Sequence, residues 1–214
     1  MLVVLEPTRC QLSVSKSRFI ASLFPVHTEH EVRTTLARIR SEFPDASHHP
    51  YAYIVNHLEH SSDDGEPGST AGRPILLALK SRQVEDVLLV VTRYFGGIKL
   101  GTAGLARAYR EAALQALDLA QLGQKTRVTI LHLQLPYALY NYIEKQLSDL
   151  NGHLLERQFT SEVSLTVSVA QSQVTNLLAA LEAGSHGQIL VQILEEGIEQ
   201  IIPLTSSAQK TPKR

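Results

Sequence analysis

Residues 87–105 read VLLVVTRYFGGIKLGTAGL, an apolar run followed by a stretch with four glycines. From 86 to 94 the chain is almost entirely apolar, which predicts a strand that is buried on both faces and central in its sheet. Residues 105–119 carry apolar side chains at helical spacing and are rich in Ala and Leu, which predicts a strong helix. A central strand, a glycine-rich loop and a helix therefore form the framework of the fold.

A second glycine-rich stretch, SSDDGEPGSTAGRP, precedes this strand at residues 61–74. We call residues 61–74 the acidic segment and residues 93–105 the basic segment. Together they hold seven of the chain's twelve glycines. Because glycine serves positions of positive φ and of close backbone approach, two such segments beside one strand predict a functional site as well as turns.

The rest of the chain is organised as two domains. Before the central strand, the patterns predict strands over 19–24 and 51–58 and helices over 29–43 and 74–80. A second unit starts near 125, with strands over 126–135, 153–159, 163–169 and 189–194 and helices over 136–150 and 174–181. This order, β-α-β-β-α-β, is that of a ferredoxin-like domain. We expect domains at 1–124 and 125–204 and a disordered tail at 205–214.

Composition sets limits on function. The chain has 214 residues and a net charge of −1, so binding to a polyanion requires a local basic patch. Its single cysteine, Cys10, fits a reducing compartment. No apolar run approaches the ~20 residues that cross a bilayer, and the apolar start is too short for a signal peptide. We expect a cytoplasmic protein without membrane association.

The basic segment has the features of an anion site. Gly96, Gly97, Gly101 and Gly104 lie between a strand and a helix, where free N–H groups and the helix dipole favour negative charge. We expect the cations to be Arg73, Arg93, Lys99 and Arg107, with Tyr94 stacking on a base. The segment lacks the GxxxxGK[ST] motif. Its anion is therefore open: a phosphate of RNA, a nucleotide or a partner's carboxylate, and a purely structural loop is the alternative.

The acidic, histidine and hydroxyl side chains near these segments indicate no specific chemistry. Asp63, Asp64 and Glu66 are candidate ligands of a hard cation such as Mg²⁺, or form ordinary turn contacts with Arg73 or Lys99. The four histidines His48, His49, His57 and His60 show no HExxH pattern, and we expect them to be exposed or hydrogen-bonded. Ser62, Ser69 and Thr70 lack a GxSxG elbow. We therefore assign no catalytic residue and no cofactor.

A combination of motifs resembles the IMPACT family, whose bacterial members are the YigZ-like proteins. The motifs are KSRFI at 16–20, ASH at 46–48, YAY at 51–53, DDGEP at 63–67, TAGRP at 70–74 and RYFGG at 93–97, followed by Leu100, Gly101, Gly104 and 107–109. The resemblance implies an α+β protein with two domains. The N-terminal one is similar to the second domain of ribosomal protein S-five, with a βαβ fold, and the C-terminal one is a ferredoxin-like domain similar to one in elongation factor G. Ser69 and Ala103 stand where the family usually has glycine.

The resemblance also implies a role in translation. Eukaryotic relatives regulate initiation by binding the activator of a starvation-sensing kinase through an additional domain. We expect a translation-associated, non-enzymatic protein that binds RNA, a ribosomal component or a translation regulator. The alternatives are a phosphate- or metal-dependent enzyme that uses both segments, and a protein-interaction module that needs no polyanion.

Overall fold

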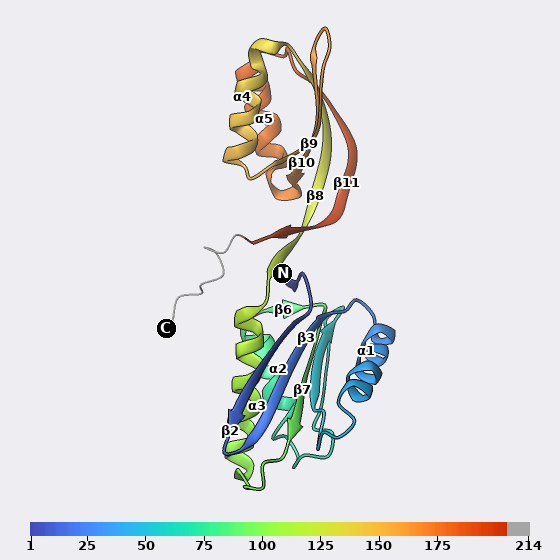
Figure 1. Ribbon diagram of the computed structural model, residues 1–214. Helices are drawn as coiled ribbons and strands as arrows, with labels where there is room; N and C mark the ends of the chain where they lie inside the picture. Colours follow the sequence, from blue (N-terminus) through green and yellow to red (C-terminus); the bar gives the residue numbers. More distant parts are fainter. Residues whose placement is uncertain (205–214) are drawn as a thin grey trace. The chain divides into compact units, whose positions relative to one another are not determined.

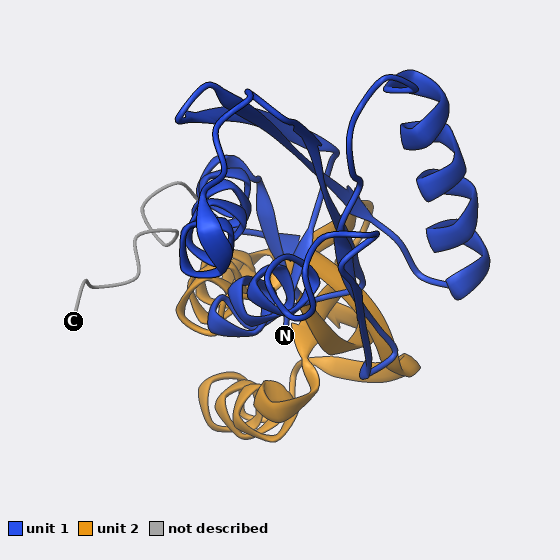
Figure 2. Cartoon of the chain, turned by 90° about the horizontal axis from the view of Figure 1, so that it is seen from below, with its two compact units in different colours: residues 1–124, 202–214 blue, residues 125–201 orange. Residues whose placement is uncertain are grey.

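The computed structural model describes residues 1–204 and divides into two compact units (Figures 1 and 2). Unit 1 runs from Met1 to Gln124 and includes the described residues from Ile202 onward. Unit 2 runs from Lys125 to Ile201. The tail that we expect at 205–214 lies outside the described residues. No helix within 1–204 is long and apolar enough to cross a membrane.

Unit 1 is built on an antiparallel five-stranded sheet with β7 in the middle. Its strands, in spatial order, are β2 (Thr8–Val14), β3 (Ser17–Pro25), β7 (Val87–Tyr94), β4 (Tyr51–Val55) and β5 (Leu58–Ser62). Every residue of β7 from Val87 to Arg93 is buried. The predicted central strand is therefore confirmed.

Helices cover both faces of this sheet (Figure 1). Helix α1 (Glu29–Glu42) packs on one face, where it meets Leu88 and Val90. Helices α2 (Gly72–Ser81) and α3 (Gly101–Leu119) pack on the other face, against Leu89 and Val91. Successive β7 side chains point to opposite faces, so this arrangement explains why the whole strand is apolar.

The strands Leu2–Val4, Thr8–Val14 and Val84–Glu85 were not predicted from the sequence. Two of the predicted elements of unit 1 also differ clearly from the structure. The strand expected over 51–58 is interrupted by a turn at Asn56 and His57, whose φ angles are 49° and 64°, so β4 and β5 form a hairpin. This two-residue turn with positive φ at both positions lacks the glycine that usually reveals it. Helix α3 starts at Gly101, four residues before the predicted start, because Gly101 and Gly104 belong to its first turn.

Unit 2 has the predicted β-α-β-β-α-β order. Its elements are β8 (Leu122–Leu135), a 3-10 turn (Tyr137–Leu139), α4 (Tyr140–Asp149), β9 (His153–Phe159), β10 (Val163–Ala170), α5 (Val174–Ser185) and β11 (Leu190–Pro203). The strands lie in the order β11-β8-β10-β9, and β10 is antiparallel to both of its neighbours. The α+β fold with two domains is confirmed.

The first and last strands of unit 2 are longer than expected because they continue into unit 1. Residues 122–124 of β8 pair with β1 (Leu2–Val4), which also pairs with β6 (Val84–Glu85). The amide of Leu204, just after β11, donates to the carbonyl of Leu122. These strand ends carry no sequence pattern of their own, so the periodicity did not reveal them.

Candidate functional site

Three loops meet at one end of the sheet of unit 1. Strands β5 and β7 run in the same direction because each is antiparallel to β4. Helix α2 follows β5 and helix α3 follows β7, so both helices start at this end. The turn between β2 and β3, at Ser15 and Lys16, also lies here, since Arg18 pairs with Tyr94 at the end of β7.

The acidic segment is organised around Asp63. Its carboxylate accepts the backbone N–H groups of Ser69, Ala71 and Gly72 at 2.7, 2.9 and 2.9 Å. Partial burial acts to raise the pKa of Asp63, but these N–H groups outweigh it and hold the pKa below its usual value. Asp63 therefore closes the loop and caps the start of α2.

The other two acidic side chains of this segment also have protein partners. Asp64 accepts the guanidinium of Arg40 and the amide of His49, both at 2.7 Å. Glu66 accepts Arg93 at 2.6 Å and the Tyr109 hydroxyl at 2.7 Å, and its side chain is only 3% exposed. Within residues 1–204, no group of three or more His, Cys, Asp or Glu side chains is arranged to hold a metal ion.

Arg93 departs from the expectation of an exposed cation. The residue is 5% exposed, and besides Glu66 it reaches the hydroxyl of Ser17 at 3.4 Å. Burial, together with Glu66, raises the pKa of Tyr109, so this hydroxyl stays protonated and donates. A buried ion pair needs such additional hydrogen bonds to offset its desolvation. Glu66 and Arg93 therefore tie the acidic segment to the basic segment inside the fold.

The remaining cations of the prediction do lie on the surface at this end. Arg73 is exposed in the first turn of α2, and Lys99 and Arg107 are exposed on either side of the start of α3. None of the three forms an ion pair within the described chain. The first turn of α3 has no side-chain cap and no acidic residue. Its free N–H groups and the helix dipole therefore add to the positive potential of these side chains.

The aromatic side chains of the basic segment are only partly covered. Tyr94 is half-buried, and the guanidinium of Arg18 lies 4.3 Å from its ring centroid. The next residue, Phe95, is 50% exposed. Tyr51 and Tyr53, in contrast, stack on one another along the sheet, and both rings lie tilted against the His60 ring.

Comparison with known proteins agrees with this arrangement. Residues 15–117 match the Impact N-terminal domain, and residues 133–188 match a domain of unknown function, DUF1949. An IMPACT family member from Haemophilus influenzae is 35% identical over 191 residues, which cover 86% of this chain and 92% of the relative. This chain belongs to the IMPACT family. The family member YigZ of Escherichia coli is 34% identical over 200 residues, 91% of this chain and 98% of YigZ.

A solved structure is similar to this chain in fold as well as in sequence. The crystal structure of a hypothetical protein superposes with a TM-score of 0.58 at 33% sequence identity, covering 91% of this chain and 97% of that one.

The two IMPACT glycine positions that this chain lacks behave differently. Ser69 adopts a φ of 61° itself, although Gly68 beside it does not have positive φ. The amide of Ser69 donates to Asp63, which holds the residue in this conformation. Ala103 lies in the first turn of α3 without positive φ and needs no glycine.

The family's glycines at 96 and 97 have distinct roles. A Cβ on Gly96 would lie 2.0 Å from the carbonyl carbon of Lys16, so only glycine lets the basic segment cross the β2–β3 turn this closely. Gly97 has a φ of 83° with open space around it, and Gly101 has a φ of 70°. These glycines therefore shape the loop, and the cations beside it carry its charge.

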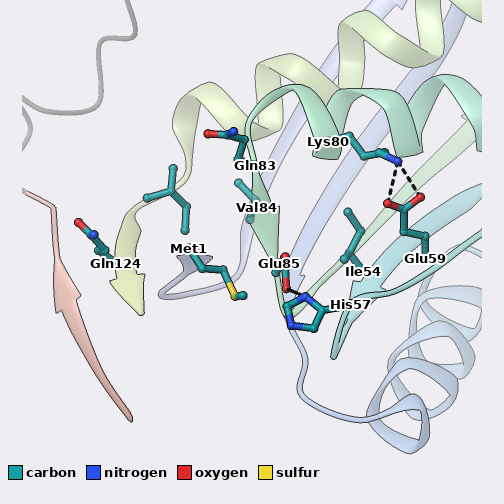
Figure 3. A pocket seen from close by; sticks show the side chains of 10 residues that line it. Met1, Ile54, His57, Glu59, Lys80, Gln83, Val84, Glu85 and Gln124 are labelled. Atoms are coloured by element: carbon teal, nitrogen blue, oxygen red, sulfur yellow. Dashed lines mark hydrogen bonds and ion pairs between the residues drawn. The ribbon is translucent and has the colours of Figure 1, made fainter. Parts of the chain in front are cut away.

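The histidines are distributed over the two ends of the IMPACT domain. At the loop end, His48 contacts the Asp64 carbonyl at 2.9 Å, and burial lowers the pKa of His49, whose ring meets the Thr92 hydroxyl at 3.1 Å. At the opposite end, the hairpin, α2 and β6 line a cavity of about 680 Å³ (Figure 3). There His57 Nδ1 lies 3.0 Å from the Glu85 carboxylate, and Lys80 pairs with Glu59 at 2.7 Å, so these polar side chains already have partners within the protein.

Sequence reasoning missed the residues that connect the three loops. Ser17 accepts both Arg93 and the Gly96 amide, and Tyr109 donates to Glu66. Ser17 and Tyr109 both belong to the quoted family motifs, but a serine and a tyrosine carry no local signal of a buried network. Successive side chains of a strand point to opposite faces, so Ser17 lies on the face opposite to the exposed Arg18. This alternation was the only sequence feature that indicated a buried position for Ser17.

Proposed function

We propose that this chain is a translation-associated protein that binds RNA through the loop end of unit 1. The observation that carries the proposal is the uncapped start of α3, with Lys99 immediately before it and Arg107 on its second turn. Arg73 adds a third cation from α2, since both helices start at the same end of the sheet. Exposed backbone N–H groups and cations together form the usual recognition element for phosphates.

The partners of the acidic segment favour binding over catalysis. Asp63, Asp64 and Glu66 accept N–H or O–H groups of the protein itself, and so they support the loop. The exposed chemistry at this end is cationic and aromatic, which suits a nucleic acid. The translational context comes from the family, since eukaryotic IMPACT proteins act on initiation.

The first prediction is that charge reversal at Lys99 and Arg107 weakens RNA binding. The affinity of the full-length chain for a labelled single-stranded RNA should fall about 50-fold between about 50 and 200 mM salt if the site neutralises about four phosphates. The Lys99→Glu/Arg107→Glu variant should bind more weakly and should lower the slope of log K against log salt by about 1.4. Fluorescence anisotropy at several salt concentrations measures both quantities.

A matched control separates local from global charge. Arg127→Glu/Lys145→Glu makes the same change in net charge on exposed residues of unit 2. It should leave affinity and slope nearly unchanged. Arg93 is unsuitable for this test because its reversal would place a negative charge beside buried Glu66. Equal effects of both double variants, or the absence of salt-dependent binding by the native chain, would refute the proposal.

A further inference from the structure

Phe95 combines exposure with a fixed backbone. Half of the residue is exposed, yet its amide donates to the Ser47 hydroxyl at 3.2 Å. The next amide, of Gly96, donates to the Ser17 hydroxyl at 3.2 Å. Gly96 also lies directly against the backbone of Lys16, where no Cβ would fit. The backbone at Phe95 is therefore held in place although it belongs to a glycine-rich loop.

Arg93, a member of the buried ion pair, contacts the Phe95 ring through its guanidinium group. The guanidinium carbon of Arg93 lies over the Phe95 ring, 5.5 Å from the centroid. Arg93 cannot turn away easily, because Glu66 holds it at 2.6 Å and the Phe19 ring lies 5.5 Å from the same guanidinium carbon. The buried Arg93 Nε has no hydrogen-bond partner in the described chain. The ionic network thus fixes an exposed aromatic surface.

Exposed cations lie on the chain segments next to Phe95. Lys16 and Arg18 are exposed on the neighbouring turn and strand, and Lys99 follows four residues later. Arg18 lies over the Tyr94 ring at 4.3 Å, which gives a second ring with an attached cation. As a binding partner, a nucleic acid suits exposed rings and cations better than an apolar protein surface does. The cations can contact phosphates while a ring stacks on a base.

We infer that Phe95 is a stacking platform for an unpaired base, so that the site selects single-stranded RNA over duplex RNA. This inference rests on the proposed function and specifies its substrate class. In an A-form duplex the bases are already stacked on one another, and only backbone and groove contacts remain for the protein. A single strand offers free base faces to the ring and phosphates to the cations. Phe95 therefore supplies strand selectivity, while Lys99 and Arg107 supply the general attraction to phosphate.

The test compares a single-stranded RNA with a duplex RNA of equal length for the native chain and three variants. Phe95→Leu keeps an apolar side chain over Arg93 but removes the ring, and Phe95→Trp keeps a ring. Ile98→Ala is the matched control, since Ile98 is 45% exposed in the same loop. Base stacking on an aromatic ring contributes enough that Phe95→Leu should weaken single-strand binding on the order of tenfold. Phe95→Trp and Ile98→Ala should change it less than about twofold, and duplex affinity should stay constant.

Each outcome has a defined meaning. A loss confined to Phe95→Leu and to the single strand supports the platform. Unchanged single-strand affinity in Phe95→Leu, or an equal loss for both RNAs, overturns the platform and leaves the proposed function intact. Failure of the native chain to bind either RNA overturns the proposed function and the platform with it. Thermal unfolding of each variant shows that the comparison is made on folded protein.

Discussion

At the scale of single residues, Ser69 is a residue with a side chain in a backbone conformation that suits glycine. Its φ of 61° costs a residue with a Cβ about 1 kcal/mol. We predict that Ser69→Gly stabilises the chain by up to about 1 kcal/mol. The gain is reduced in part because glycine also gives the unfolded chain more conformational freedom. Urea unfolding at equilibrium measures the difference.

Ser69→Ala is the control for this substitution. Alanine removes the hydroxyl but keeps the Cβ, so it should leave the stability near that of the native chain. The amide that donates to Asp63 is present in all three proteins. A stabilisation by alanine as large as that by glycine would show that the backbone conformation is not the cause.

At the scale of elements, the Glu66–Arg93 pair connects the loop before α2 to the end of β7. Both side chains are at least 94% buried, with exposures of 3% and 6%. We predict that Glu66→Gln destabilises the fold by about 3 to 5 kcal/mol, because it leaves the Arg93 charge buried without a counterion. The double variant Glu66→Gln/Arg93→Met should be less destabilised than the sum of the two single variants, by about 1 kcal/mol or more.

A double-mutant cycle in urea, with both single variants and the double variant, checks this coupling. Additive effects would mean that the two segments are held together by other contacts. Tyr109 is the natural third member, since its hydroxyl donates to the same carboxylate oxygen as Arg93.

The same pair shows how far sequence reasoning reaches. Most of the helices and strands, the central position of β7 and the two-domain organisation follow from hydrophobic periodicity, whereas β1, β2 and β6 were not predicted. The pattern predicts Arg93 as a cation of the anion site, whereas the structure buries its side chain against Glu66. A positive side chain after an apolar strand has the same sequence signature whether it faces solvent or a buried carboxylate. Only the packing of Glu66, 27 residues away, decides between the two.

At the scale of the whole molecule, each unit has a hydrophobic core of its own. Leu165 belongs to the core of unit 2 and is fully buried, and no residue of the proposed RNA site belongs to that core. We predict that Leu165→Ala destabilises unit 2 by about 2 to 5 kcal/mol, as expected for a large cavity-forming substitution. Because the site belongs to unit 1, RNA affinity should stay within about twofold of the native value under conditions where unit 2 remains folded.

Hydrogen exchange resolved by segment can separate the two units in this experiment. Amides of α4, α5 and β10 should exchange faster in Leu165→Ala, whereas those of β3, β7 and α3 should keep their protection. The matched substitution in unit 1 is Leu89→Ala, since Leu89 is also fully buried. In this variant the amides of unit 1 should exchange faster while those of unit 2 keep their protection. RNA binding should become weaker because unit 1 is destabilised. Loss of protection in both units from either substitution would mean that the continuous strands β8 and β11 make the chain one cooperative unit. Independent responses would show that the stability of unit 1, which carries the proposed RNA site, does not depend on that of unit 2.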